Sequence, residues 1–98
     1  MTPAAVFYRI HTENQEHLPA YVAEWFDFFN IVVGTGYWKG IPEKSATIEI
    51  IGQTEDAERV SDLANVIRHV FTQEAVYVTS HPVELTKIWT VKPAQVAQ

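Results

Sequence analysis

The chain of 98 residues contains no cysteine, which excludes disulfide bonds and thiolate chemistry. Positive charge is also scarce: seven lysine and arginine residues stand against twelve aspartate and glutamate residues, giving a formal net charge of -5. Binding to nucleic-acid backbones depends on basic surface that neutralises phosphates. Because the few basic residues are scattered along the chain, we do not expect a nucleic-acid partner.

The sequence has no long apolar run, and none of its apolar stretches approaches the roughly 20 residues that cross a lipid bilayer. The N-terminal residues also lack the basic region and the long apolar stretch of a signal peptide. We therefore expect no membrane partner, and a cytoplasmic location is the default prediction.

Apolar residues are nevertheless plentiful: hydrophobic residues make up 47% of the chain and aromatic residues 12%. That proportion is sufficient for a packed core and too high for a disordered chain. A chain of this length forms one domain. We expect a single domain over residues 1–92, followed by a flexible tail at residues 93–98.

Two segments have the periodicity of amphipathic helices. The clearer one lies at residues 57–71, where apolar residues recur at spacings of three and four, and we expect Thr54 to cap its N-terminus. Its apolar positions are Ala57, Val60, Leu63, Ala64, Ile67, Val70 and Phe71. A shorter helix is predicted from about Pro19 to about Phe26, with the proline in its first turn.

Runs of β-branched and aromatic residues predict four strands, at residues 5–11, 28–33, 45–51 and 75–79. Gly34 and Gly36 are expected to form a bulge that interrupts the second strand. The turn to the third strand is placed at residues 40–44, and Pro82 is expected to break the fourth strand. Residues 85–91 predict a short fifth strand or arm.

The order of these elements is β-α-β-β-α-β, which is typical of the ferredoxin-like α+β sandwich. In this fold two helices cover one face of a four-stranded antiparallel sheet. We expect the first and fourth strands at the centre and the second and third strands as an edge hairpin. The uncovered face would be solvated, used for binding or covered by a second copy. We therefore predict a homodimer or higher homo-oligomer, with residues 85–91 either exchanged between subunits or folded back.

The candidate binding loop has the sequence G-T-G-Y-W-K-G at residues 34–40. Tyr37 and Trp38 would provide an aromatic floor, and Lys39 would provide a cation for a phosphate or carboxylate group. The alternative is a hairpin whose aromatic rings only pack against the protein or a neighbouring subunit. The glycines do not match a phosphate-binding motif, so a phosphate-cradling loop is not predicted.

Three further polar residues are candidates for the uncovered face of the sheet. Glu49 lies in the middle of an apolar strand, where it can meet Arg9 or His11 from another strand. A cross-strand ion pair is the preferred interpretation, and general acid–base catalysis is the alternative. The histidines lack the spacing of a zinc site. We predict no metal, no cofactor and no catalytic residue.

Three segments, at residues 34–40, 44–50 and 73–78, resemble a set of small uncharacterised bacterial and phage-borne proteins with no assigned chemistry. In fold the chain is also similar to PII-like, CutA-like and ACT-type modules and to dimeric α+β barrels. The resemblance to these modules implies ligand binding and oligomeric assembly. The resemblance to the barrels implies chemistry on a small substrate.

The sequence thus predicts a non-enzymatic oligomeric module that binds a small ligand, such as an anion or nucleotide, or a partner protein. In a phage such a module would serve as a host-directed inhibitor or as a sponge for a signalling nucleotide. The alternative is a small cofactor-free enzyme of the dimeric α+β barrel type. It would use Tyr8, His11 or Glu49 in a pocket between the helices and the sheet.

Overall fold

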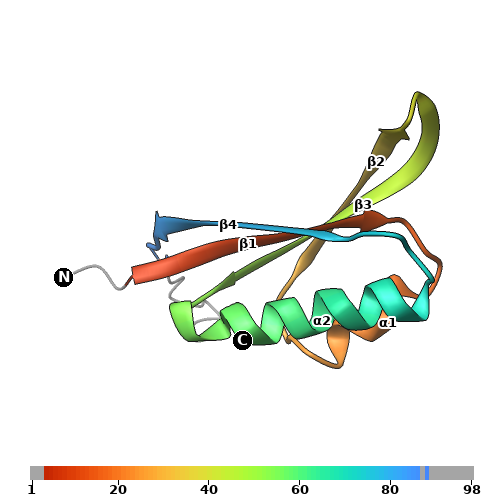
Figure 1. Cartoon of the computed structure of the whole chain (residues 1–98). Helices are drawn as coiled ribbons and strands as arrows, with labels where there is room; N and C mark the ends of the chain where they lie inside the picture. The colour runs from red at the N-terminus through yellow and green to blue at the C-terminus, as the bar shows by residue number, and fades with distance from the viewer. Residues whose placement is uncertain (1–3, 87, 89–98) are drawn as a thin grey trace, which may run out of the picture.

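The structure, a computed structural model, describes residues 4–86 and 88. Its elements in chain order are β1 (Ala4–Glu13), α1 (Leu18–Ala23), β2 (Asn30–Trp38), β3 (Ile41–Gly52), the 3₁₀ turn η1 (Thr54–Asp56), α2 (Ala57–Val70) and β4 (Tyr77–Glu84). Both helices lie against one face of a four-stranded antiparallel sheet (Figure 1). The predicted ferredoxin-like α+β fold is therefore confirmed. The predicted fifth strand or arm and the tail lie mostly outside the described residues.

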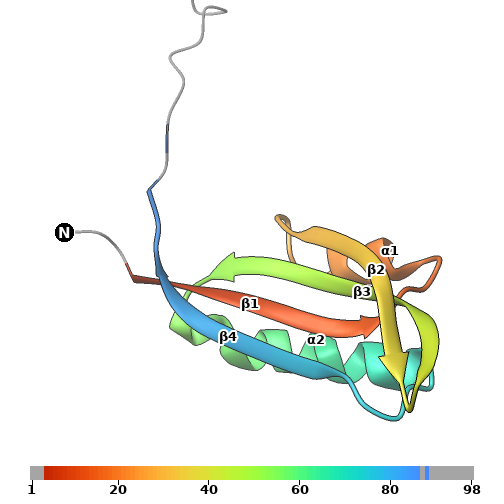
Figure 2. The ribbon, with the colours of Figure 1, turned by 90° about the horizontal axis from the view of Figure 1, so that it is seen from above.

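The strand order is β2-β3-β1-β4, which Figure 2 shows from the uncovered face of the sheet. The prediction that the first strand is central is therefore confirmed, but the prediction that the fourth strand is central is wrong, because β4 lies at an edge and β3 is central. β1 pairs antiparallel with both β3 and β4, so these two strands run parallel with β1 between them. Parallel strands need a long crossover, and α2 provides it.

The core lies between the sheet and the two helices. Alternate residues of β1 and β3 face the helices because side chains along a strand point to opposite faces. The buried core residues are Tyr8, Ile10, Leu18, Val22, Ala46, Ile48, Ile50, Val60, Leu63, Ala64 and Ile67. The opposite side of the sheet, which we call the open face, carries the intervening residues. The helices described are too short and too polar to cross a bilayer.

α1 is shorter than predicted and ends at Ala23. The Trp25 and Phe26 N–H groups both donate to the Val22 carbonyl, which closes the last turn. The guanidinium of Arg59 on α2 donates to the Trp25 carbonyl and lies 5.2 Å from the Phe26 ring centroid. The aromatic residues after α1 thus belong to a tethered loop that packs against the margin of the core.

The hairpin between β2 and β3 is tighter and longer than predicted. Gly34 and Gly36 pair in register with β3, so the expected bulge is absent from β2. The turn consists only of Lys39 and Gly40, with φ of 51° and 81°. Two central residues with positive φ match the right-handed twist of the flanking strands, which is why hairpins favour such turns.

β4 continues through the residues expected to break it. His81 pairs with Phe7 and Pro82 pairs with Val6. Proline has no N–H to donate, but an edge strand has one side without a partner, so the sheet tolerates proline there. Pro82 therefore marks the edge of the sheet and does not end the strand.

The side-chain cap lies on the turn η1, which leads into α2, and Thr54 does not provide it. The carboxylate of Asp56, and not the side chain of Thr54, accepts a hydrogen bond of 2.8 Å from the Gln53 N–H. Gly52 makes room for this cap, since a Cβ at Gly52 would lie 2.6 Å from Asp56 Oδ2. The buried Tyr8 hydroxyl also donates to the Gln53 carbonyl and so ties β1 to the same turn.

Gly52→Ala should lower the free energy of unfolding by about 1–2 kcal/mol, because the added methyl group displaces the capping carboxylate. Gly34→Ala is the matched control, since the nearest atom to its Cβ would be Ser45 Oγ at 3.7 Å. Urea unfolding measures both. When Asp56 is already replaced by alanine, Gly52→Ala should cause almost no further loss in the free energy of unfolding. An equal loss with and without Asp56 would contradict this explanation.

Tyr8 should make stability depend on alkaline pH. Burial, together with the carboxylates of Asp56 and Glu55, raises the pKa of the Tyr8 phenol above its ordinary value of 10.0. Above about pH 10 the unfolded chain therefore loses this proton before the folded chain does, and the free energy of unfolding falls. Below about pH 10 the Tyr8 phenol is protonated in both states, so its full contribution to the free energy of unfolding is present.

Tyr8→Phe should lower the free energy of unfolding by about 1 kcal/mol near neutral pH, because the hydrogen bond is lost. It should also flatten the decline above about pH 10 relative to the wild type. Urea unfolding at a series of pH values measures both effects. An equal alkaline decline in the two proteins would show that Tyr8 does not carry it.

Candidate ligand-binding site

The β2–β3 hairpin extends beyond the rest of the sheet. β1 pairs with β3 only as far as Glu13 and Ser45, whereas β2 and β3 continue to pair up to Trp38 and Ile41. Residues 35–44 therefore form a two-stranded projection, which we call the hairpin arm. Figure 1 shows it rising from the sheet on the side away from the helices.

A cavity of about 330 Å³ lies at the base of the hairpin arm, between the arm, the end of β1 and the loop after α2, and we call it the arm cavity. Side chains from β1, the arm, β3, the loop after α2 and the start of β4 line it. The lining residues are His11, Thr12, Glu13, Gly36, Tyr37, Trp38, Glu43, Ser45, Ala46, Thr47, Gln73, Glu74, Ala75 and Tyr77.

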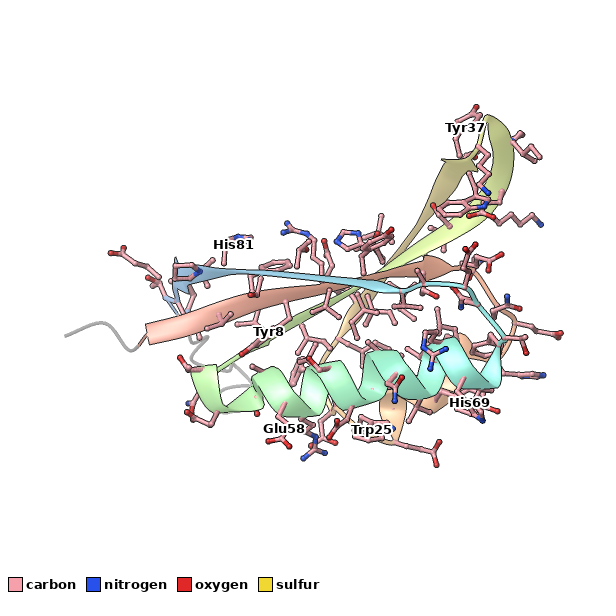
Figure 3. The ribbon with its side chains drawn as sticks, in the orientation of Figure 1. Tyr8, Trp25, Tyr37, Glu58, His69 and His81 are labelled. Atoms are coloured by element: carbon pink, nitrogen blue, oxygen red, sulfur yellow. The ribbon has the colours of Figure 1, made fainter. Side chains whose placement is uncertain are left out.

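Three of the six predicted site residues, Tyr37, Trp38 and His11, line this cavity. Figure 3 shows Tyr37 at the far end of the arm. Trp38 is 43% exposed and Tyr37 is 72% exposed, so these rings are not core residues. The Lys39 Nζ lies 5.6 Å from the Trp38 ring centroid. His11 Nε2 is 2.9 Å from the hydroxyl of Thr79 on β4.

The other three predicted residues are not among the lining residues: Lys39 lies in the hairpin turn, and Arg9 and Glu49 lie nearer the opposite end of the sheet. Arg9 and Glu49 face each other across β1 and β3, with Arg9 Nε 3.7 Å from Glu49 Oε2. The Arg9 guanidinium also lies 4.2 Å from the Phe7 ring centroid. Both side chains are partly exposed, so this ion pair contributes little to stability.

The enzyme alternative would use Tyr8, His11 or Glu49 in a pocket between the helices and the sheet. Tyr8 faces the helices and is buried. His11 and Glu49 lie at alternating positions that place them on the open face, where His11 meets Thr79 and Glu49 meets Arg9. These three residues therefore do not share a pocket.

Sequence reasoning missed Gln73, which is only 6% exposed. The end of α2 positions it: Thr72 has φ of 52°, and the N–H groups of Thr72 and Gln73 donate to the carbonyls of His69 and Arg68. This is the Schellman arrangement, which usually places glycine at the left-handed position. A threonine there gives no recognisable signal in the sequence.

The Gln73 amide is held from one side only. The Thr12 hydroxyl donates to its Oε1 at 2.8 Å, and the Glu13 N–H donates to the same oxygen at 3.2 Å. A backbone N–H can only donate, so the oxygen and not the nitrogen of the amide must face Glu13. The Gln73 Nε2 is buried and has no hydrogen-bond partner among the described residues.

A second hollow of about 510 Å³ lies at the other end of the open face. Its lining is mostly apolar and includes Phe7, Phe28 and Ile51 together with Leu85 and Ile88. Within the described ranges, no group of three histidine, aspartate or glutamate side chains could hold a metal ion.

No protein-family model and no curated protein matches the chain. Nine solved chains do match it. One of them is the de novo designed protein Foldit4, which is 16% identical, with the match covering 85% of this chain and 98% of that one at a TM-score of 0.36. A likeness this distant supports no conclusion about function, so any functional argument depends on the residues of the chain itself.

Proposed function

We propose that the chain is a non-enzymatic binding module that takes up a small ligand in the arm cavity. One observation carries this proposal: the cavity gathers aromatic and polar side chains from three segments that are far apart in the sequence, at residues 11–13, 36–47 and 73–77. Small-molecule sites are concave, combine aromatic surface with a few polar groups, and have volumes of about 300–1,000 Å³.

The exposed aromatic rings support this role. Trp38 and Tyr77 are 43% and 63% exposed at the cavity, although large aromatic side chains are usually buried. Such rings can stack on the flat or apolar part of a ligand. The hydroxyl groups of Ser45 and Thr47 in the wall can then orient it through hydrogen bonds.

The space between the helices and the sheet, where the enzyme alternative needs its pocket, is filled by apolar core residues. That packing favours the binding module over a barrel-type enzyme. A partner protein in place of a small ligand stays a prediction. So does the role of phage-borne inhibitor or nucleotide sponge, which depends only on the resemblance.

We also propose that the module is a homodimer in which β2 pairs with β2 of a second copy. β2 is an edge strand of nine residues that contains no charged residue and no proline. Val32 and Val33 near its middle are 54% and 58% exposed. Natural sheets usually protect an edge with charges, proline or a bulge, because free N–H and C=O groups recruit another strand.

The other edge of the sheet provides the contrast. β4 contains His81, Pro82 and Glu84, which are features that discourage edge-to-edge pairing. Two β2 strands related by a two-fold axis would run antiparallel and present the same surface to each other, as a closed dimer requires. Such a dimer leaves the open face and the arm cavity accessible.

Ligand retention tests the function. Native mass spectrometry of freshly purified protein should show a subunit carrying extra mass from a small molecule. Trp38→Leu should lose that mass while its melting temperature stays within about 2 °C, because a partly exposed arm residue contributes little to stability. Phe28→Leu is the matched control, since Phe28 is an exposed aromatic residue outside the arm cavity. A bare wild-type mass, with no thermal shift from a metabolite library, would contradict the proposal.

The subunit contact is tested by placing charge on the edge. Val33→Lys should weaken the dimer by about tenfold or more, because two lysines would then face each other near the two-fold axis. Sedimentation velocity at a series of concentrations measures this effect. Val70→Lys is the matched control, because Val70 is an exposed valine on α2. A wild-type monomer, or equal effects of the two substitutions, would rule out the β2 contact.

A further inference from the structure

The carboxylates of the arm cavity indicate the charge of its ligand. Glu13 from β1, Glu43 from the arm and Glu74 from the loop after α2 all line it. The described lining residues include no lysine and no arginine, and the Lys39 ammonium beside the Trp38 ring is one positive charge against three carboxylates. Carboxylates grouped in a concave site with no basic residue among them create a negative local potential. The net charge of the chain, -5, has the same sign. The cavity should therefore attract a cation and repel an anion.

The aromatic rings of the cavity favour the same kind of ligand. The face of an aromatic ring attracts a cation, and tryptophan does so most strongly. The Lys39 ammonium already lies 5.6 Å from the Trp38 ring centroid, which places that ring within reach of a positive charge. Lys39 is exposed in the hairpin turn, so a ligand cation can displace it. Tyr77 presents a second exposed ring to the cavity.

The amide of Gln73 adds a second requirement. Its oxygen is occupied by Thr12 and Glu13, whereas its nitrogen has no partner among the described residues. Buried donors are normally paired, so the unpaired donor of a residue that lines the cavity favours a ligand with an acceptor oxygen. The Schellman turn at Thr72 and the bond from Glu13 hold this amide in place before any ligand arrives.

We infer that the arm cavity binds a small organic cation that also carries a hydrogen-bond acceptor, such as an acylated amine. This inference rests on the proposed ligand-binding function and specifies the chemistry of the ligand. The positive group lies among the carboxylates and the Trp38 ring, and the acceptor oxygen faces the Gln73 amide. It differs from the anionic ligand predicted from Lys39, because here Lys39 competes with the ligand.

Nuclear magnetic resonance titration of the ¹⁵N-labelled full chain tests this inference, with acetylcholine as the probe. Acetylcholine combines a quaternary ammonium with an ester carbonyl, and its uncharged isostere 3,3-dimethylbutyl acetate is the matched ligand. Acetylcholine should shift the Trp38 indole N–H and the Gln73 side-chain amide saturably. The isostere should bind about tenfold more weakly, which is the size of effect expected for a partly desolvated cation on an aromatic ring.

Three variants separate the contributions of individual residues. Glu43→Gln should weaken acetylcholine binding by about threefold to tenfold, and Lys39→Gln should tighten it by about twofold, because a competing positive charge is removed. Glu58→Gln on the exposed side of α2, which Figure 3 shows far from the arm, should change nothing. A parallel titration with Nα-acetyl-lysine N-methylamide distinguishes a lysine side chain from a free quaternary amine as the source of the cation.

Three results would overturn the inference. If adenosine monophosphate binds at these resonances and Lys39→Gln abolishes that binding, the cavity is an anion site and only the proposed ligand charge fails. If the isostere binds as tightly as acetylcholine, the cavity recognises the shape of the ligand and not its charge. The inferred ligand charge is then wrong, and the proposed binding function is unaffected. Absence of any shift with every probe overturns the cation inference. Combined with a bare native mass, that absence removes the binding function as well.

Discussion

The length mismatch between β1 and β3 determines most of what is unusual in this molecule. β1 ends at Glu13, where the Asn14 N–H donates to the Lys44 carbonyl and the chain turns away toward α1. Beyond that point β2 is the only strand among the described residues that pairs with β3. The hairpin arm and the cavity at its base both follow from this early departure of β1. A longer β1 would pair with the arm and fill the cavity with its own backbone.

The spacing of apolar residues along the chain was sufficient to predict a helix such as α2, which has one buried face. It was not sufficient to place the hairpin turn or the end of β4, because these depend on contacts between segments that are distant in the sequence. α2 was predictable because a helix with one buried face must repeat its apolar residues every three to four positions. The turn was misplaced because Pro42 and its neighbours have the composition of a turn, while Lys39 and Gly40 adopt the positive φ values. Pro82 predicted a strand end, yet proline is compatible with an edge strand. The sequence of one strand does not show whether it is central or at an edge.

The site was predictable only in its aromatic part. Adjacent tyrosine and tryptophan residues among glycines predict an exposed binding loop, and the structure places Trp38 at the cavity. The carboxylates were not predictable as a group, because Glu13, Glu43 and Glu74 belong to three segments that only the folded sheet and α2 bring together. Gln73 depends on a left-handed threonine at the end of α2, a conformation that sequence pattern assigns to glycine or asparagine. The open face is therefore polar and acidic toward the arm and apolar toward the opposite end.

The central position of β1 has a consequence for how the chain acquires its structure during synthesis. β1 is translated first, but its two neighbours are β3, which begins at Ile41, and β4, which ends at Glu84. The β2–β3 hairpin closes through a two-residue turn and needs no distant segment. The ladders of β1, by contrast, join residues that are far apart in the chain, and such contacts form slowly because a long loop must close first. The first strand of this domain to be translated is therefore the one whose pairing is completed last: its ladder with β3 requires the chain up to Gly52, and its ladder with β4 requires the chain up to Glu84.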